Sequence, residues 1–288
     1  ERLDDEPLIN EESLSLCRWL ADYYHHSMGE VLEHMIPTML RRGCDLAEAD
    51  ERVWIKNDYH PEPKLRGSKQ QALWRLFDEE QDEWPHSELT GLGFTLAQLR
   101  SLADAGLIRE QQKLPLPTVV TELQESHTLN AQQQDALKAI AAKADQFCPV
   151  LLEGVTGSGK TEVYLRLIES VLEQGKQALV LVPEIGLTPQ TVRRFQARFD
   201  VPVALLHSGL NDRERLQGWR QCREGGARIL IGTRSAAFTP MPDLGLIILD
   251  EEHDGSFKQQ DGLRYSARDF ALVRAQRAGV PVVLMPRV

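Results

Sequence analysis

The fold of this chain is decided by the stretch GVTGSGKT at residues 154–161. It has the form of a glycine-rich phosphate loop, in which backbone N–H groups surround a phosphate with no side chain in the way. A short apolar run at 150–152 precedes the loop, and residues 162–174 carry apolar side chains at mostly helical spacing after it. Strand, loop and helix therefore stand in the order that a phosphate-binding unit requires. An ordinary glycine-rich turn is the alternative, and the strand and helix on either side disfavour it.

The residues of this loop predict a site for ATP and Mg²⁺. Lys160 would place its ammonium group against the β and γ phosphates, and Thr161 would offer its hydroxyl to the metal. The N-terminus of the following helix would direct its positive dipole end toward the same anion. The predicted nucleotide-binding residues of the loop are Gly154, Thr156, Gly157, Ser158, Gly159, Lys160 and Thr161.

Acidic residues at the end of another apolar stretch predict the second half of this site. Residues 244–249 are almost continuously apolar, as in a strand covered on both faces, and Asp250 and Glu251 follow directly. Because ligands bind at the carboxyl ends of parallel strands, we expect Asp250 to hold the magnesium and Glu251 to orient or deprotonate the attacking water. The predicted catalytic residues are therefore Lys160, Asp250 and Glu251. A solvated acidic turn is the alternative, but a buried strand that ends on ionisable groups needs a cation or a partner.

The composition is that of a globular protein in water. The 288 residues leave room for about two domains, and 42% of them are hydrophobic while 26% are charged. No apolar run approaches the roughly 20 residues that span a bilayer, and no signal segment opens the chain, so we expect a cytoplasmic location and no membrane partner. Because the first residue is Glu1 and not Met, we expect the chain to begin inside a longer protein.

Charge is distributed unevenly along the chain. The formal net charge is -10, but residues 128–288 hold 18 acidic and 20 basic side chains, which is a net charge of +2. Residues 1–46 and 47–127 each have a net charge of -6. The acidic total therefore does not exclude nucleic acid, because a basic groove on one face is enough to attract a phosphate backbone.

Cysteine and histidine spacing predicts no metal site. No Cys-x-x-Cys pair occurs, so we expect the cysteines to be buried and reduced, with neither a zinc site nor a disulfide framework. The three histidines of the front region lack the spacing of metal ligands and are expected at a surface or an interface. The residues concerned are Cys17, Cys44, Cys148, Cys222, His25, His26 and His34.

Short apolar runs alternate with amphipathic stretches from residue 129 onward. About six strands joined by helical crossovers predict an α/β fold with a mainly parallel, doubly wound sheet, the core of one helicase-type (RecA-like) lobe. The stretch 118–127 is predicted to be the linker in front of this lobe. The expected strands are 150–152, 178–182, 203–206, 229–231, 246–249 and 280–284.

The region before the linker predicts helices more strongly than strands. Residues 68–77 indicate one helix, and Thr95 with Gln98 forms a capping box that opens another, closed by Gly106. This pattern predicts a winged-helix-like domain over 47–117, with a small helical domain that makes no DNA contact as the alternative.

Two amphipathic helices are expected nearer the N-terminus, at 11–26 and 30–42, with a break at Gly29. Two helices of this length cannot close a hydrophobic core alone.

Four further blocks identify a family. They are VPEIGLTPQ at 182–190, HSGL at 207–210, GTRSA at 232–236 and DEEH at 250–253. With these blocks the chain resembles, over essentially its whole length, the primosomal protein N′ (PriA) family of bacterial replication-restart DNA helicases in superfamily 2. The resemblance implies an ATP-dependent 3′-to-5′ DNA helicase that binds single-stranded and forked DNA during primosome assembly. It also implies primosome proteins and single-stranded DNA-binding protein as partners.

Strand ends and the resemblance together suggest where DNA would bind. Residues 232–235 follow a strand, so hydroxyl groups and a guanidinium can hold backbone phosphates there, with a polar strand-end loop as the alternative. Thr188 is expected to cap the helix that carries Arg193. The predicted DNA-binding residues are Thr188, Arg193, Ser208, Thr233, Arg234, Ser235, Phe257, Lys258, Arg264 and Tyr265.

Residues 255–265 are similar to the family's aromatic-rich loop. Phe257 and Tyr265 are expected to stack on bases of single-stranded DNA, and anchoring of the loop by its aromatic side chains is the alternative. Leu263 stands where the family often has tryptophan, which weakens the stacking prediction at that position. The resemblance also places Gln133 against adenine, since a side-chain amide can donate and accept hydrogen bonds simultaneously, whereas an exposed helix start is the alternative.

The resemblance also assigns the domains. Residues 1–46 correspond to the C-terminal part of a 3′-end DNA-binding domain, 47–117 to a winged helix, and 128–288 to helicase lobe 1, which is expected to stop before motif III. The second lobe, with its arginine finger and the family's cysteine zinc site, is expected to be absent, so zinc is expected only in the full-length family. Since phosphoryl transfer depends on such an arginine, we expect this chain alone to bind ATP with little turnover.

Two other functions stay open at this point. One is a non-catalytic fragment that binds ATP, DNA or primosome partners without hydrolysis. The other is a lobe of a restriction-type or RNA translocase, which the residues at 183–186 and 250–253 disfavour.

Overall fold

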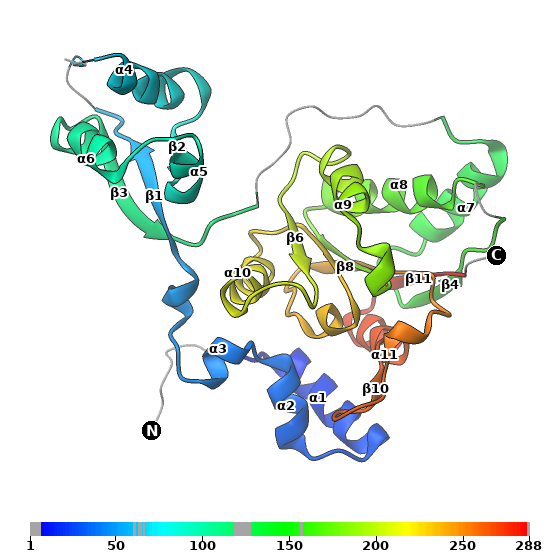
Figure 1. Ribbon diagram of the computed structural model, residues 1–288. Helices are drawn as coiled ribbons and strands as arrows, with labels where there is room; N and C mark the ends of the chain where they lie inside the picture. Colours follow the sequence, from blue (N-terminus) through cyan, green and yellow to red (C-terminus); the bar gives the residue numbers. More distant parts are fainter. Residues whose placement is uncertain are drawn as a thin grey trace. The chain divides into compact units, whose positions relative to one another are not determined.

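A six-stranded parallel sheet forms the centre of the larger part of the chain (Figure 1). The structure is a computed structural model that describes residues 7–59, 62, 65, 67–117, 128–155 and 158–286. The chain divides into two compact units, one made of residues 1–45 and 116–288 and the other of residues 46–115. The linker predicted at 118–127 lies outside the described residues.

The strands of this sheet lie in the order β4-β11-β8-β5-β7-β6, and every neighbouring pair is parallel. Parallel neighbours cannot be joined by a hairpin, so each connection crosses the sheet, mostly through a helix. The predicted α/β fold with a doubly wound parallel sheet is confirmed. The strands are β4 (Cys148–Leu151), β5 (Gln177–Leu181), β6 (Val203–Leu206), β7 (Ile229–Gly232), β8 (Leu244–Asp250) and β11 (Pro281–Met285).

Alternate residues of the central strand β5 belong to two different hydrophobic clusters. Leu179 and Leu181 lie in one cluster, and Ala178 and Val180 lie in the other. Because successive side chains of a strand point to opposite faces, the two clusters cover the two faces of the sheet. The helices of the second cluster are α7 (Ala131–Ala141), α8 (Lys160–Glu173) and α9 (Pro189–Gln196). Those of the first are α1 (Glu11–Tyr24), α2 (Met28–Met35), α10 (Asp212–Arg223) and α11 (Ala267–Ala278).

Short elements follow several strands of the sheet. Three 3-10 helices and a small hairpin lie in the connections and shape the loops around the site described below. They are η3 (Glu184–Gly186), η4 (Arg234–Phe238), η5 (Gly255–Phe257), β9 (Lys258–Gln259) and β10 (Tyr265–Ser266).

The break between the front helices lies earlier than predicted. Helix α1 ends at Tyr24 and α2 begins at Met28, so Gly29 lies inside α2 and does not form the break. His25 adopts a left-handed φ of 58°, and Ser27 opens α2 through a capping box. The cap residues, and not the glycine, therefore set the corner.

The second front helix, predicted at 30–42, is interrupted. Ile36 is extended because proline at position 37 disfavours a helical conformation in the residue before it. The separate short helix α3 (Thr38–Arg41) follows this break.

Helices α1 and α2 share a hydrophobic core with the sheet. Leu16, Leu20, Val31 and Met35 are buried in the same cluster as Phe270 of α11. The front helices therefore cover part of one face of the sheet, where they bury apolar surface that two helices alone could not.

The smaller unit, residues 46–115, has a three-stranded antiparallel sheet in the order β2-β1-β3. The capping box predicted at Thr95 and Gln98 is present, and Gly106, with a φ of 72°, follows the end of the helix. The strands give a weak sequence signal because they are largely polar: in β3, which has the sequence IREQQK, only Ile108 is buried. The winged-helix-like character of this unit stays a prediction.

The elements of this unit are mostly short. They are η1 (Leu46–Ala49), β1 (Glu51–Lys56), α4 (Ser68–Arg75), the π-helical segment η2 (Leu76–Glu80), β2 (Glu83–Pro85), α5 (His86–Gly91), α6 (Leu96–Asp104) and β3 (Ile108–Lys113). Among all helices in the described part of the chain, none combines the length and the apolar character that crossing a bilayer requires.

The four cysteines have free thiols. Cys17 and Cys222 are buried, whereas Cys44 and Cys148 are half-buried. Burial raises the pKa of Cys17 to about 11 and that of Cys222 to about 12. Both buried thiols are therefore protonated at neutral pH and unreactive.

Candidate nucleotide-binding site

The phosphate loop connects strand β4, which ends at Leu151, to helix α8, which begins at Lys160. Gly159 precedes the helix with a left-handed φ of 79°, and a Cβ at this position would collide with the side-chain amide of Gln133. The left-handed φ favours glycine there, whereas the amide of Gln133 lies at the end of a flexible side chain that can move away. Thr156 and Gly157 of the predicted site lie outside the described residues.

Lys160 is held by main-chain carbonyl groups of the loop and of the sheet edge. Its Nζ donates to the carbonyl oxygen of Gly154 and, at 3.2 Å, to that of Pro286, which follows β11. An ammonium group has three donors and no acceptor. A phosphate at this position would therefore replace or supplement these carbonyl oxygens as the acceptor for Lys160.

Strand β8 carries Asp250 to the same edge of the sheet. Burial raises the pKa of this carboxyl above its ordinary value, and the charge of Glu251 adds to the effect. The Glu251 N–H, which donates to Asp250 Oδ1 at 2.9 Å, and the Lys160 ammonium act in the opposite direction. A cation beside Asp250 would offset the cost of burying its charge, so the carboxyl suits a metal ligand.

Glu251 has a strained backbone. Its φ of 49° lies in the left-handed region, which is uncommon for a residue other than glycine. Its carbonyl oxygen accepts a hydrogen bond from Asp254 N at 2.8 Å, and Glu252 N donates to Met285 O at 2.9 Å. These bonds hold the turn of the acidic box, residues 250–253, against the end of β11. Strain of this kind persists only where surrounding contacts impose it, and it is common at functional sites.

Thr161, Asp250 and Glu251 line one cavity of about 1380 Å³. The loop at 183–189 and helix α9 form another wall of this cavity. Two segments that are distant in the sequence therefore meet at one edge of the sheet. Because Mg²⁺ prefers hydroxyl and carboxylate oxygens, the residues of this cavity, named the nucleotide cavity below, fit a magnesium-bound triphosphate.

Residues 130–285, which contain the phosphate loop, the acidic box and the nucleotide cavity, match the family model of the DEAD/DEAH box helicases. The chain belongs to the DEAD/DEAH box helicase family. A second family model, described as a 3′ DNA-binding domain, matches residues 1–37.

Relatives with curated descriptions are consistent with this family. The chain is 42% identical to replication restart protein PriA of Haemophilus influenzae and 36% identical to that of Chlamydia pneumoniae, in each case over 98% of this chain. It is 41% identical to PriA of Bacillus subtilis over 76% of this chain. The matched regions make up 40%, 39% and 28% of these three relatives, so the chain spans less than half of their length. The resemblance to the PriA family is confirmed.

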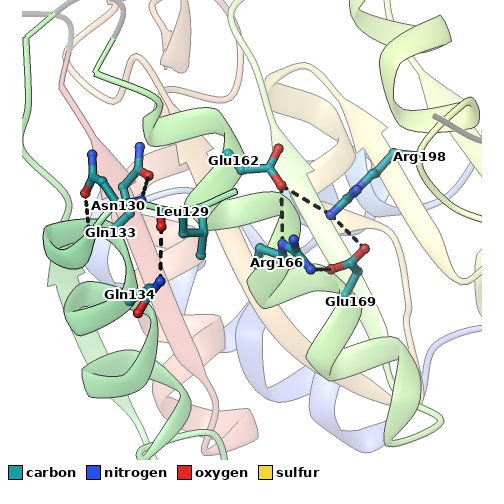
Figure 2. Close-up of polar contacts among 8 residues, drawn as sticks. All are labelled: Leu129, Asn130, Gln133, Gln134, Glu162, Arg166, Glu169 and Arg198. Atoms are coloured by element: carbon teal, nitrogen blue, oxygen red, sulfur yellow. Dashed lines mark hydrogen bonds and ion pairs between the residues drawn. The ribbon is translucent and has the colours of Figure 1, made fainter. Parts of the chain in front are cut away.

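Gln133 of the helicase lobe contacts the phosphate loop directly. Its Nε2 donates to Ser158 O at 2.8 Å. Its Oε1 accepts from Asn130 N at 2.8 Å in the capping box of α7 (Figure 2). Both polar ends of the side chain are used within the protein. In this structure Gln133 therefore ties α7 to the loop, and its contact with adenine stays a prediction.

A network of ion pairs joins helix α8 to the chain that follows α9 (Figure 2). Arg198, whose side chain is 7% exposed, pairs with Glu162 at 3.3 Å and with Glu169 at 2.8 Å. Arg166 pairs with the same two carboxylates at 3.3 Å each. Since Glu162 directly follows Thr161, the network fixes the first turn of α8. Sequence reasoning missed it: the spacing within α8 signals the contacts of Arg166, but no local pattern points to Arg198.

Six of the predicted DNA-binding side chains of the helicase lobe are exposed. Thr188 also caps α9 as predicted, since its hydroxyl accepts from Thr191 N at 3.1 Å. Ser208 and Ser235 line a separate cavity of about 560 Å³. The exposed residues of the predicted set are Thr188, Arg193, Ser208, Ser235, Lys258 and Arg264.

The predicted stacking of bases on Phe257 and Tyr265 is wrong. The two side chains are 1% and 4% exposed, and they lie with Leu263 in the hydrophobic cluster beneath the hairpin. A ring buried to this extent has no free face for a base. The structure shows the alternative, in which the aromatic side chains anchor their loop.

Of two residues predicted to hold DNA phosphates, one is buried and the other makes hydrogen bonds within the chain. Thr233 is 4% exposed, so its side chain does not present a hydroxyl to a ligand. Arg234 donates from Nη1 to the carbonyl oxygens of Ser256 and Lys258 at 3.0 Å each. Its guanidinium therefore holds the segment that follows the acidic box. In this strand-end loop Ser235 is the predicted residue with an exposed side chain.

Proposed function

We propose that this chain is part of an ATP-dependent DNA helicase that moves 3′ to 5′ and acts in primosome assembly and replication restart. The observation that carries the proposal is the nucleotide cavity, in which Thr161 meets Asp250 and Glu251. The PriA relatives support the biological setting, and the match of residues 1–37 to a 3′ DNA-binding domain supports a DNA substrate.

Lys160 and the residues of the nucleotide cavity divide the chemistry of ATP hydrolysis among them. Lys160 binds phosphate oxygens, and Thr161 and Asp250 would hold Mg²⁺. The metal, when bound, supplies positive charge that offsets charge developing on the phosphates. Glu251 orients the attacking water and accepts its proton, which a carboxylate at this position can do without a further residue.

Single-stranded and forked DNA are the proposed nucleic-acid ligands. Exposed hydroxyl groups of Ser208 and Ser235 and exposed cations of Lys258 and Arg264 support contact with a phosphate backbone. Such contacts position a strand without reading its sequence, as a helicase requires. Primosome proteins and single-stranded DNA-binding protein are proposed partners, supported by the PriA relatives alone.

Rates of ATP hydrolysis with and without single-stranded DNA test this function. We expect this chain to bind ATP with Mg²⁺ but to turn it over slowly, and a polypeptide extended through a second helicase lobe to hydrolyse ATP with strong stimulation by DNA. In the extended polypeptide Lys160→Ala abolishes binding or turnover, whereas Glu251→Gln keeps binding and slows hydrolysis by about 100-fold or more. The exposed Lys138 on α7 offers the control substitution Lys138→Ala. Equal turnover without DNA would contradict the helicase function, and normal hydrolysis by Glu251→Gln would contradict the role of that carboxylate.

A further inference from the structure

A line of polar contacts runs from front helix α1 to the acidic box. Tyr24 Oη donates to Asp269 Oδ2 at 3.1 Å. The other oxygen of Asp269, Oδ1, lies 3.5 Å from Arg268 Nε, and Arg268 Nη1 donates to Glu252 Oε2 at 3.0 Å. Four side chains thus connect the N-terminal segment to the turn that carries Asp250 and Glu251.

The α1 end of this line is anchored at two points. The hydroxyl of Tyr24 also accepts a hydrogen bond from Ser266 N at 3.1 Å, at the start of α11. Two residues later, His26 Nε2 accepts from Arg264 N at 3.0 Å. Burial raises the pKa of Tyr24 to about 12, so its hydroxyl is a proton donor at neutral pH. The corner between α1 and α2 therefore holds the hairpin and the first turn of α11.

The Glu252 end of the line is close to a strained turn. The Glu252 side chain is 14% exposed, and its backbone N–H is bonded to the end of β11. The preceding residue, Glu251, has a φ of 49°. A turn in this conformation is kept by its contacts, so a change at the Glu252 side chain is transmitted to the two carboxylates before it.

We propose that Tyr24, Asp269 and Arg268 are positioning residues for the acidic box, through which helix α1 sets how well the nucleotide cavity binds magnesium and nucleotide together. The inference rests on the proposed nucleotide function. It also joins two sites: a ligand that moves α1 changes nucleotide affinity, and nucleotide changes the affinity for that ligand by the same factor.

Arginine at position 268 is required by the geometry of the line. Its Nε faces Asp269 while its Nη1 faces Glu252, so one rigid group contacts two carboxylates. The ammonium of lysine is a single point of charge and cannot reproduce this fork. Arg268→Lys is therefore expected to keep a positive charge at the box but to disconnect it from Tyr24.

Binding of a fluorescent ATP analogue to this chain, with and without Mg²⁺, tests the proposal. We expect Tyr24→Phe and Arg268→Lys each to weaken binding about fivefold in the presence of Mg²⁺ and to leave metal-free binding unchanged. A purely structural loss would weaken both. The control is Tyr23→Phe, because Tyr23 is the neighbouring tyrosine of α1 and is 60% exposed. Thermal unfolding of each variant checks that the fold is kept.

A double-variant cycle identifies the path of the effect. If Tyr24 acts through Glu252, then Tyr24→Phe combined with Glu252→Gln binds the Mg²⁺ nucleotide no more weakly than Glu252→Gln alone. Additive losses in the double variant would overturn the proposal. So would unchanged Mg²⁺-dependent binding in both Tyr24→Phe and Arg268→Lys while the unsubstituted chain binds. Failure of the unsubstituted chain to bind nucleotide would instead overturn the proposed function itself.

Discussion

At the scale of single residues, the acidic box combines two features that lower the stability of the folded chain. The carboxyl of Asp250 is partly buried, which raises its pKa, and Glu251 has a left-handed backbone. Each feature destabilises the folded chain, and each is typical of a site whose geometry is fixed before its ligand arrives. Binding of the proposed metal and nucleotide would offset this energetic cost.

Asp250→Asn is expected to raise the free energy of unfolding of the chain in the absence of Mg²⁺. Because burial raises the folded-state pKa of Asp250 above its ordinary value of 3.8, the contribution of this carboxyl to stability is present below that value and is lost as pH rises through the folded-state pKa. Asparagine does not ionise, so the gain grows from acidic to neutral pH and is then constant.

Urea unfolding over this pH range measures the effect of Asp250→Asn. The exposed Asp200 offers the control substitution Asp200→Asn, which should leave the free energy of unfolding almost unchanged. The same Asp250→Asn chain should lose Mg²⁺-dependent nucleotide binding. A chain that is less stable at neutral pH than the unsubstituted one would show that Asp250 is held by contacts and not destabilised by burial.

Residues with local signals were predicted well, and residues with long-range partners were not. The sequence predicts that Thr161 and Asp250 lie at one edge of the sheet because a phosphate loop and an acidic strand end are each encoded in consecutive residues, and both residues line the nucleotide cavity. The ring of Tyr265 is buried partly because it packs against Phe238, whose ring centroid lies 4.9 Å away and which belongs to a different part of the chain. An aromatic residue beside basic residues suggests a surface for base stacking, because the sequence alone does not show which distant residues cover the ring.

At the scale of helices and strands, hydrophobic pattern predicted what is buried on both faces. Strands β5 and β8 were found as unbroken apolar runs, since parallel strands between two helical layers have no polar face. Strands β1 and β3 were missed because charged and amide side chains interrupt their apolar pattern: four residues of β3 are exposed, and Glu51, Arg52 and Lys56 of β1 are half-buried. The short helix α3 was missed because a single proline at 37 divides an otherwise helical pattern.

Helix α8 depends on Arg198 for its connection to the segment after α9. Arg198→Met is expected to lower the free energy of unfolding by about 2 kcal/mol, because it removes one of the two arginines that pair with Glu162 and Glu169 and leaves Arg166 alone to offset their charge. Denaturant unfolding measures this loss.

Removing the two carboxylates as well is the matched control for Arg198→Met. With Glu162→Gln and Glu169→Gln in the same chain, most of the lost stability should return, because the carboxylates that Arg198 offsets are then neutral and the remaining charge of the network, on Arg166, is on a side chain that is 30% exposed. Additive losses across the three substitutions would indicate that Arg198 acts through its packing and not through its charge.

At the scale of the whole molecule, charge is separated along the chain. The residues before 128 have a net charge of -12, while the helicase lobe has a net charge of +2, which gives the total of -10. A chain with this distribution can bind a polyanion through the lobe despite its acidic total. Its affinity for nucleic acid must then fall steeply with salt.

The combined substitution Lys258→Ala and Arg264→Ala is expected to weaken binding of a single-stranded oligonucleotide. Each lost phosphate contact should reduce the slope of log affinity against log salt by about 1, and both side chains are exposed. Fluorescence anisotropy at several salt concentrations measures the slope. The control Phe257→Leu removes a buried ring and should leave the slope unchanged while lowering stability. If a folded Phe257→Leu chain lost more affinity than the chain with Lys258→Ala and Arg264→Ala, the result would support base stacking on the Phe257 ring.

The apolar contacts of α1 and α2 with α11 have a practical consequence for anyone who wishes to handle the lobe by itself. Leu16, Leu20, Val31 and Met35 cover one side of it. A polypeptide beginning at residue 116 would expose the apolar surface that α1 and α2 cover. Exposed apolar patches of this kind promote aggregation. A shortened polypeptide should therefore retain α1 and α2. Residues 46–115 form a compact unit of their own, so they can be deleted and replaced by a linker that joins residue 45 to residue 116.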